Sequence, residues 1–191
     1  MPDGLCTCLV HLVRKEGGPM SEPRLPSVPP GHEDPTRPAS DRQGQVVVVT
    51  YNHIAAAIVA IAQVVGRPTV VLDHRDAATD PDTWLSEHPL GLPDALVFCD
   101  HDAPRTLELL RAALEGETGY VAMLGSRRRA RSVFAALRDE DLSDGALKRL
   151  HVPAGLDIGG KASGEIALSV VSEIVATSYG RDGGPMQGDT T

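Results

Sequence analysis

Residues 120–131 read YVAMLGSRRRAR, and this stretch decides the fold. Residues 120–124 are a short apolar run typical of a buried strand. Gly125 breaks the run, and Ser126 is a residue type preferred as the N-cap of a helix. Apolar residues then recur at helical spacing along one face, at Ala130, Val133, Phe134 and Leu137. The stretch therefore predicts a strand, a tight turn and an amphipathic helix.

The turn also predicts a binding site for an anion. The first amides of a helix have no partner inside the helix and favour negative charge beside them. Arg127, Arg128 and Arg129 crowd this first turn, where each exposed cation opposes the helix dipole by about 0.3–1 kcal/mol. An anionic ligand held by Gly125, Ser126, Arg127 and Arg128 would reverse the sign of that interaction. A solvated basic patch on a surface helix is the open alternative.

The rest of the chain alternates between strand and helix patterns. Further strands are expected at Val46–Val49, Thr69–Leu72, residues 95–99 and residues 154–158, the last running into a glycine-rich turn. Helices are expected at residues 54–65, 103–114, 143–150 and from residue 163. Such alternation predicts a Rossmann-like three-layer α/β domain with a mostly parallel, doubly wound sheet. We expect this domain to span residues 45–179, between polar, Pro- and Gly-rich tails at 1–44 and 180–191.

Open α/β sheets bind ligands beyond the carboxyl ends of their strands. The candidates at those ends, besides the arginine turn, are Tyr51, Asn52, His53, Asp73, Arg75, His101, Asp102, Asp157 and Gly159. Gly159 and its neighbour Gly160 are suited to an anion-binding nest. The structural alternatives are a solvated turn role for Asp73 and helix capping by Asp102. No residue pattern identifies a catalytic nucleophile or base.

The turn after the first strand bears on nucleotide binding. A dinucleotide-binding domain has a G-x-G-x-x-G pattern there, whereas residues 50–53 of this chain contain no glycine. Side chains at Tyr51 and Asn52 would obstruct the close approach of a pyrophosphate. Asp73 is nevertheless placed to hold a ribose. Nucleotide binding stays open, with tight NAD(P) binding the less favoured outcome.

Three segments carry a family resemblance: GYVAMLGSRRR at 119–129, LSDGALKRLHVPAGLDIGG at 142–160 and GEIALSVVSEIVA at 164–176. Together they resemble the C-terminal Rossmann-like domain of the XdhC family, accessory proteins of molybdenum hydroxylases such as xanthine dehydrogenase. The resemblance extends back through VFCDHD and VVLDHR to about Val46. It implies a maturation factor that binds or presents molybdenum cofactor (molybdopterin) for insertion into such an enzyme. Family members usually show a glycine-rich turn followed by His, and this chain keeps the His as His53.

The resemblance also bears on partners. Typical members carry a separate N-terminal domain with a cysteine-containing motif, and nothing in this chain resembles it. Any role that rests on that domain is either absent or supplied by another chain, such as a separate N-terminal-type XdhC chain. A sulfur-donating desulfurase and the molybdenum hydroxylase client are the other partners that the resemblance implies. A homodimer is expected as well, because residues 54–65 are apolar nearly all round, with Gln63 the clearly polar member.

Composition excludes several classes of protein. The net charge of −8 argues against a general nucleic-acid binder, and no apolar run reaches the roughly 20 residues of a membrane span. Cys6, Cys8 and His11 lack a second ligand pair, so no metal site is expected, and Cys99 reads as a packed core residue. We expect a cytoplasmic protein whose start is Met1 or Met20.

Two other functions remain open at this point. One is an NAD(P)- or nucleotide-binding Rossmann protein that acts as an oxidoreductase, which the fold alone suggests. The other is a non-catalytic interaction module with a degenerate pocket, which the glycine-free turn at residues 50–53 fits equally well.

Overall fold

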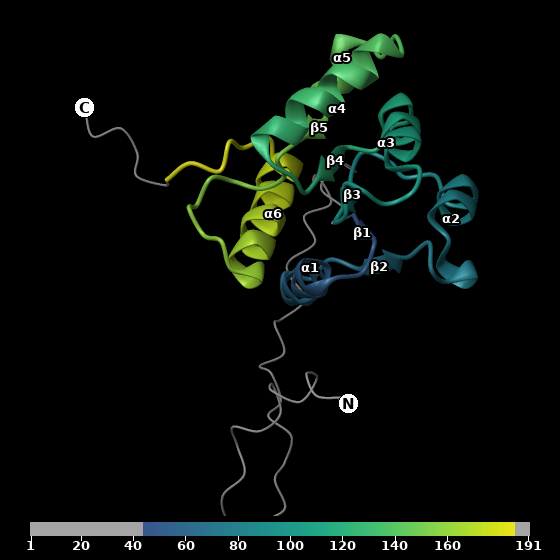
Figure 1. Ribbon diagram of the computed structural model, residues 1–191. Coiled ribbons are helices and arrows are strands. Elements are labelled where there is room, and N and C mark those ends of the chain that lie inside the picture. The colour runs from purple at the N-terminus through teal and green to yellow at the C-terminus, as the bar shows by residue number, and fades with distance from the viewer. Residues whose placement is uncertain (1–43, 186–191) are drawn as a thin grey trace, which may run out of the picture. The chain divides into compact units, whose positions relative to one another are not determined.

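The computed structural model of the protein describes residues 44–185. They form one all-parallel five-stranded sheet in the order β2-β1-β3-β4-β5 (Figure 1). The parallel arrangement of the strands is the one that the sequence predicts. The strands are β1 (Val46–Val49), β2 (Thr69–Leu72), β3 (Ala95–Phe98), β4 (Tyr120–Met123) and β5 (Leu150–His151). The chain winds in one direction from β1 to β2 and in the other from β3 onward, so the sheet is doubly wound.

Helices cover both faces of the sheet, which gives three layers. The helices are α1 (His53–Val64), α2 (Pro81–Glu87), α3 (Thr106–Glu115), α4 (Arg127–Asp139), α5 (Asp144–Leu147) and α6 (Ser163–Ser178), with a short 3₁₀ turn, η2, at Ala77–Thr79. Val46 and Val48 pack under α1 and α6, whereas Val47 and Val49 face the side covered by α2 to α5. This alternation follows from the two-residue period of a strand, and burial on both faces explains the unbroken run of valines.

The last strand lies where the sequence pattern placed a helix. Residues 154–158 are loop, and β5 is instead Leu150–His151, paired with Val121 and Ala122 of β4. The physical reason is tertiary: the Arg149 guanidinium donates hydrogen bonds to the carbonyls of Leu114, Gly116 and Thr118 where α3 ends. These bonds draw the chain out of the helix after α5 and against the edge of β4.

Helix α1 is covered from inside the domain, because α6 packs beside it on the same face of the sheet (Figure 1). The end of α1 still exposes Val64 by 86% and its C-cap Val65 by 40%. The homodimer therefore stays a prediction, and the exposed apolar surface that supports it is smaller than the sequence indicated. None of the helices within residues 44–185 combines the length and apolar character that crossing a membrane requires.

Some sequence-based expectations fall outside the described residues. These are the tails at 1–43 and 186–191, with Cys6, Cys8, His11 and the alternative start Met20. The predicted domain boundaries therefore stay a prediction.

Candidate anion-binding cleft

A cleft of about 610 Å³ lies at the carboxyl edge of the sheet, between the turn after β4 and the loop that follows β5. From the turn it takes Leu124, Gly125 and Arg127; from the loop, residues 153–161. Ile54 of α1 and Ile166 and Ser169 of α6 complete the lining. The cleft thus joins a helix N-terminus, a glycine-rich loop and an apolar floor.

The N-terminus of α4 is built as the sequence predicts. Ser126 is the N-cap, and its hydroxyl oxygen accepts a hydrogen bond from the amide of Arg129 at 3.2 Å. The amides of Arg127 and Arg128 are the first two of the helix, where no intrahelical carbonyl can reach them. Neither has an acceptor among residues 44–185. Two donors therefore remain beside the cleft.

The arginines of this turn have different roles. Arg129 is held by Asp102, with 2.7 Å between guanidinium and carboxylate, and so ties α4 to the turn after β3. Arg127 lies 3.7 Å from Asp157, but both side chains are more than 80% exposed, at 86% and 87%. Such exposed pairs contribute only about 0–1 kcal/mol. Arg128 is exposed and has no ion pair within the described chain, so Arg127 and Arg128 are the cations free to meet a ligand.

The glycine-rich loop is held to α6 at both ends by carboxylates. Glu173 accepts from the amide of Gly155 at 2.7 Å, and Glu165 accepts from the amides of Lys161 and Ala162, each at 2.9 Å. The two backbone hydrogen bonds lower the pKa of Glu165. The predicted nest beside Gly159 and Gly160 thus already has a carboxylate of this chain at its α6 end. The open side of the loop is Gly159, around which a side chain would meet nothing within 4 Å.

Sequence reasoning missed the polar cluster around Glu173. Its carboxylate also accepts from the Tyr120 hydroxyl at 2.5 Å and lies 3.0 Å from Nδ1 of His151, and the two rings stack with centroids 4.4 Å apart. Burial raises the pKa of Glu173, but hydrogen bonds from His151, Tyr120 and Gly155 outweigh it and leave the pKa lowered. Burial raises the pKa of Tyr120. The available signal was a single carboxylate within the apolar face of α6.

In the turn after β1, the side chain of Asn52 occupies the free amides at the start of α1. The Asn52 carboxamide oxygen accepts from the amides of Ile54 and Ala55, both at 2.9 Å, and its nitrogen donates to the Cys99 carbonyl at 2.9 Å. These are the helix amides that a pyrophosphate would use. Asn52 therefore caps α1, and Tyr51 and His53 point outward as exposed residues.

Asp73 and Arg75 satisfy each other. Oδ1 of Asp73 accepts from the amide and Nε of Arg75, and Oδ2 accepts from the Tyr51 amide and from Nη2 of Arg75 at 2.5 Å. The Arg75 side chain holds the pKa of Asp73 far below its usual range. All four hydrogen bonds come from groups of this chain, so this carboxylate links the end of β1 to the end of β2.

His101 and Asp102 lie in the exposed turn after β3, 3.4 Å apart. Helix α3 begins at Thr106 behind Arg105, whose φ of 56° is left-handed, so the alternative that Asp102 caps this helix is wrong. Asp102 binds Arg129 instead. Cys99 is buried, and burial raises the pKa of its thiol to about 12, as expected for a packed core residue.

Only part of the predicted residue set meets in the cleft. Gly125, Arg127, Asp157 and Gly159 line it, whereas Ser126 and Arg128 are the chain neighbours of Arg127 at the start of α4 and are not part of the lining. The structure adds a second cation and apolar residues to this lining: Lys161, Ile54, Leu124, Leu156, Ile158 and Ile166. The other predicted residues lie outside it: Tyr51, Asn52, His53, Asp73, Arg75, His101 and Asp102.

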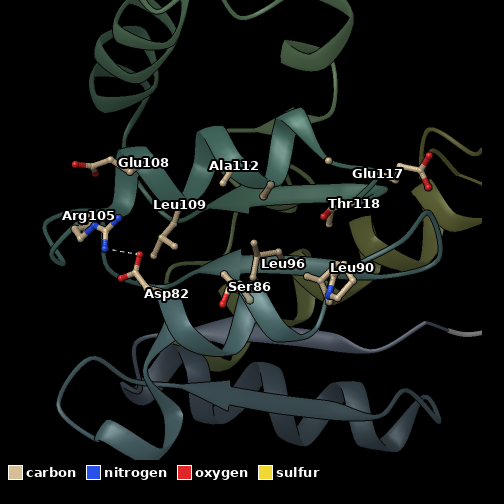
Figure 2. A pocket seen from close by; sticks show the side chains of 14 residues that line it. Asp82, Ser86, Leu90, Leu96, Arg105, Glu108, Leu109, Ala112, Glu117 and Thr118 are labelled. Carbon is tan, nitrogen blue, oxygen red and sulfur yellow. Dashed lines mark ion pairs between the residues drawn. The ribbon is translucent and has the colours of Figure 1, made fainter.

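A second pocket, of about 480 Å³, lies between α2 and α3 (Figure 2). Figure 2 shows Leu109 and Leu96 along its wall and the ion pair of Asp82 and Arg105, 2.8 Å apart, at one end. The two charges of this pair neutralise each other, and the other lining is largely apolar except for Glu108 and Glu117. The pocket therefore carries a net negative charge and does not suit an anion.

A parallel, doubly wound sheet with a cleft at the carboxyl ends of its strands defines a Rossmann-like α/β domain. A sequence model of the family described as the XdhC Rossmann domain matches residues 46–174. The chain belongs to the XdhC family, as its motifs predict.

Relatives agree with this family. The chain is 26% identical over 156 residues to "Uncharacterized protein YqeB" of Escherichia coli, covering 74% of this chain and 29% of that protein. It is 28% identical over 97 residues to a Bacillus subtilis protein named as a probable subunit of xanthine dehydrogenase, covering 51% and 27%. A crystal structure of a xanthine dehydrogenase from Bacillus halodurans superposes with a TM-score of 0.59 at 25% identity, covering 73% of this chain and 44% of that one. The chain thus spans less than half the length of each.

Thr50 provides a test of the turn after β1. Its φ of 72° is left-handed, which is costly for a β-branched residue, and its buried hydroxyl has no hydrogen-bond partner in the structure. We expect Thr50→Gly to raise the free energy of unfolding by about 1 kcal/mol, since relief of strain and of the orphan hydroxyl outweighs the added chain entropy. Urea denaturation measures this. Thr69→Gly, in the extended strand β2, is the control and should lower the free energy of unfolding. An equal decrease in both variants would contradict the backbone strain at Thr50.

Glu173 provides a test of how the loop is held. Because its pKa is lowered in the folded state, its contribution is present above the ordinary Glu pKa of about 4.3 and is lost as the pH falls through the folded value. We expect Glu173→Gln to lower the free energy of unfolding at neutral pH by about 1–3 kcal/mol and to flatten its acid dependence. Urea titrations between neutral and acid pH measure both. Glu87→Gln, an exposed control in α2, should change neither; an unchanged acid slope in Glu173→Gln would refute the role of Glu173.

Proposed function

We propose that this domain is an accessory protein of molybdenum hydroxylases that binds molybdenum cofactor by its phosphate and presents it to the enzyme. The observation that carries the proposal is the cleft, where Arg127 and an apolar floor lie beside the two α4 amides, of Arg127 and Arg128, that have no acceptor within the described chain. Membership of the XdhC family supports it. So do the names of two relatives, each given as a xanthine dehydrogenase or as part of one.

The donor set of the cleft fits the organic part of this cofactor. Its phosphate suits the helix amides and arginines, and its pterin ring suits a floor of Ile54, Leu124 and Leu156. The volume of about 610 Å³ falls in the range of small-molecule sites. No Cys or His lines the cleft within the described chain, so this domain would hold the pterin and phosphate and leave the metal exposed. Once inserted, the metal supplies the redox chemistry of the client enzyme.

The chain's own residues then have distinct tasks. Arg127 and Arg128 neutralise the phosphate, and the amides of the same two residues fix its position. Glu173 and Glu165 keep the glycine-rich loop closed over the other side. Sulfur for the metal would come from a desulfurase, or through a separate N-terminal-type XdhC chain. We place these steps in the cytoplasm and expect a homodimer.

NAD(P)-dependent oxidoreduction is the competing proposal, and its supporting observation is the sheet topology. Two features weigh against it: Asn52 occupies the α1 amides, and Arg75 saturates the Asp73 carboxylate that would hold a ribose. A non-catalytic module with a degenerate pocket would bind neither ligand.

The double variant Arg127→Gln/Arg128→Gln tests the cleft. We expect its affinity for molybdopterin, released anaerobically from a purified molybdenum hydroxylase, to fall by about tenfold, as two exposed charge-assisted contacts are lost. The salt dependence of binding should flatten as well. The ligand-free variant should melt at the same temperature or slightly higher, because repulsion with the helix dipole is relieved. Fluorescence titration and thermal denaturation measure these effects.

The charge-matched control is Arg111→Gln/Lys148→Gln, which removes two cations on the surface away from the cleft. It should bind molybdopterin as the wild type does. NAD and NADP are tested in parallel, and tighter binding of either would favour the oxidoreductase. Wild-type affinity combined with a clearly lowered melting temperature in Arg127→Gln/Arg128→Gln would show that these arginines are structural.

A further inference from the structure

A second groove, of about 500 Å³, runs along the exposed side of α4 next to the cleft. Arg127, Arg131 and Arg138 line it from the helix, together with Phe134 and the loop residues Val152 and Pro153. Arg127 and Pro153 also line the cleft. The groove and the cleft are therefore neighbouring parts of one face.

The charge of this groove is unbalanced. Arg131 and Arg138 are exposed, and neither forms an ion pair within the described chain, although the whole protein carries a net charge of −8. By contrast, Arg111 of α3 pairs with Glu115 and Glu140 at 3.0 and 3.2 Å. The groove thus presents cations without internal partners, beside a half-buried aromatic ring.

We propose that this groove docks an acidic segment of a partner polypeptide that carries an apolar side chain. Carboxylates would pair with Arg131 and Arg138, and the apolar side chain would cover Phe134. Arg131 and Arg138 are seven residues apart, about 10 Å along a helix. A polyproline II segment rises about 3.1 Å per residue with three residues per turn, so it covers this distance in about three residues and presents every third side chain on the same face. Acidic residues at every third position therefore fit the groove.

The observations favour a polypeptide over a nucleic acid. The overall negative charge opposes a polyphosphate backbone, and Phe134 is the one aromatic ring among the residues that line the groove. Resting on the proposed function, the partner is the client enzyme or another protein of cofactor maturation. A segment seated here would lie at the mouth of the cleft, where the cofactor is handed over.

The test measures the anisotropy of a fluorescein-labelled short peptide with Glu at every third position and Leu or Phe between. A matched peptide has Gln for Glu, and an unlabelled oligothymidylate serves as competitor. We expect the acidic peptide to bind wild-type protein and the Gln peptide to bind about tenfold more weakly. Arg131→Gln/Arg138→Gln should cause a similar loss, as should Ala135→Glu, which places a carboxylate on the exposed floor of the groove. Arg111→Gln/Lys148→Gln should retain wild-type affinity.

The same variants are titrated with inorganic pyrophosphate to separate this proposal from the cleft. Arg131→Gln/Arg138→Gln should leave pyrophosphate affinity within about twofold of wild type, because neither residue lines the cleft. Three results would overturn the docking proposal. The two peptides could bind wild-type protein equally well, or Arg111→Gln/Lys148→Gln could lose as much peptide affinity as Arg131→Gln/Arg138→Gln. Oligothymidylate could also displace the labelled peptide at a lower concentration than the unlabelled acidic peptide does. Failure of the wild type to bind pyrophosphate, with peptide binding intact, would instead count against the cleft.

Discussion

The candidate site depends on the hydrogen bonds that the Glu173 carboxylate accepts. This carboxylate receives hydrogen bonds from the Tyr120 hydroxyl of β4 and the Gly155 amide of the loop, and it lies beside the His151 ring of β5. A half-buried carboxylate is stable only when its lone pairs are satisfied, so α6, the last two strands and the loop are fixed together. The cleft is the space left between that fixed loop and the start of α4.

A Rossmann-like sheet offers several helix N-termini along its carboxyl edge, and this chain treats them differently. At α1 the Asn52 side chain takes the free amides, and Asp73 is saturated by Arg75. At α6 no side chain of the described residues caps the helix, but the Glu165 carboxylate accepts from the amides of Lys161 and Ala162 just before it and places a negative charge in the first turn. At α4 the Ser126 hydroxyl accepts from one amide, and two arginines stand beside the rest. Anion binding is therefore favoured after β4, away from the usual dinucleotide position after β1.

Features set by local sequence could be predicted. The valine run of β1, the Gly125-Ser126 turn and the amphipathic face of α4 are determined by residues close together in the chain, and each lies where the pattern indicated. The strand at Leu150–His151 depends on Arg149 reaching the end of α3, and the role of Glu173 depends on β4 and β5, so neither has a local signal. Arg75 was ambiguous because a guanidinium pairs equally well with a ligand or with a neighbouring Asp73.

The most direct measurement is an NMR titration of the isotopically labelled protein with inorganic pyrophosphate, which follows the backbone amide signals. We expect the amide signals of Arg127, Arg128 and Gly159 to shift first and saturate together, while those of Ile54 and Ala55, held by Asn52, stay in place. Shifts centred on Ile54 and Ala55, with the amides of α4 unchanged, would place the anion site after β1 and contradict the proposed site at the start of α4.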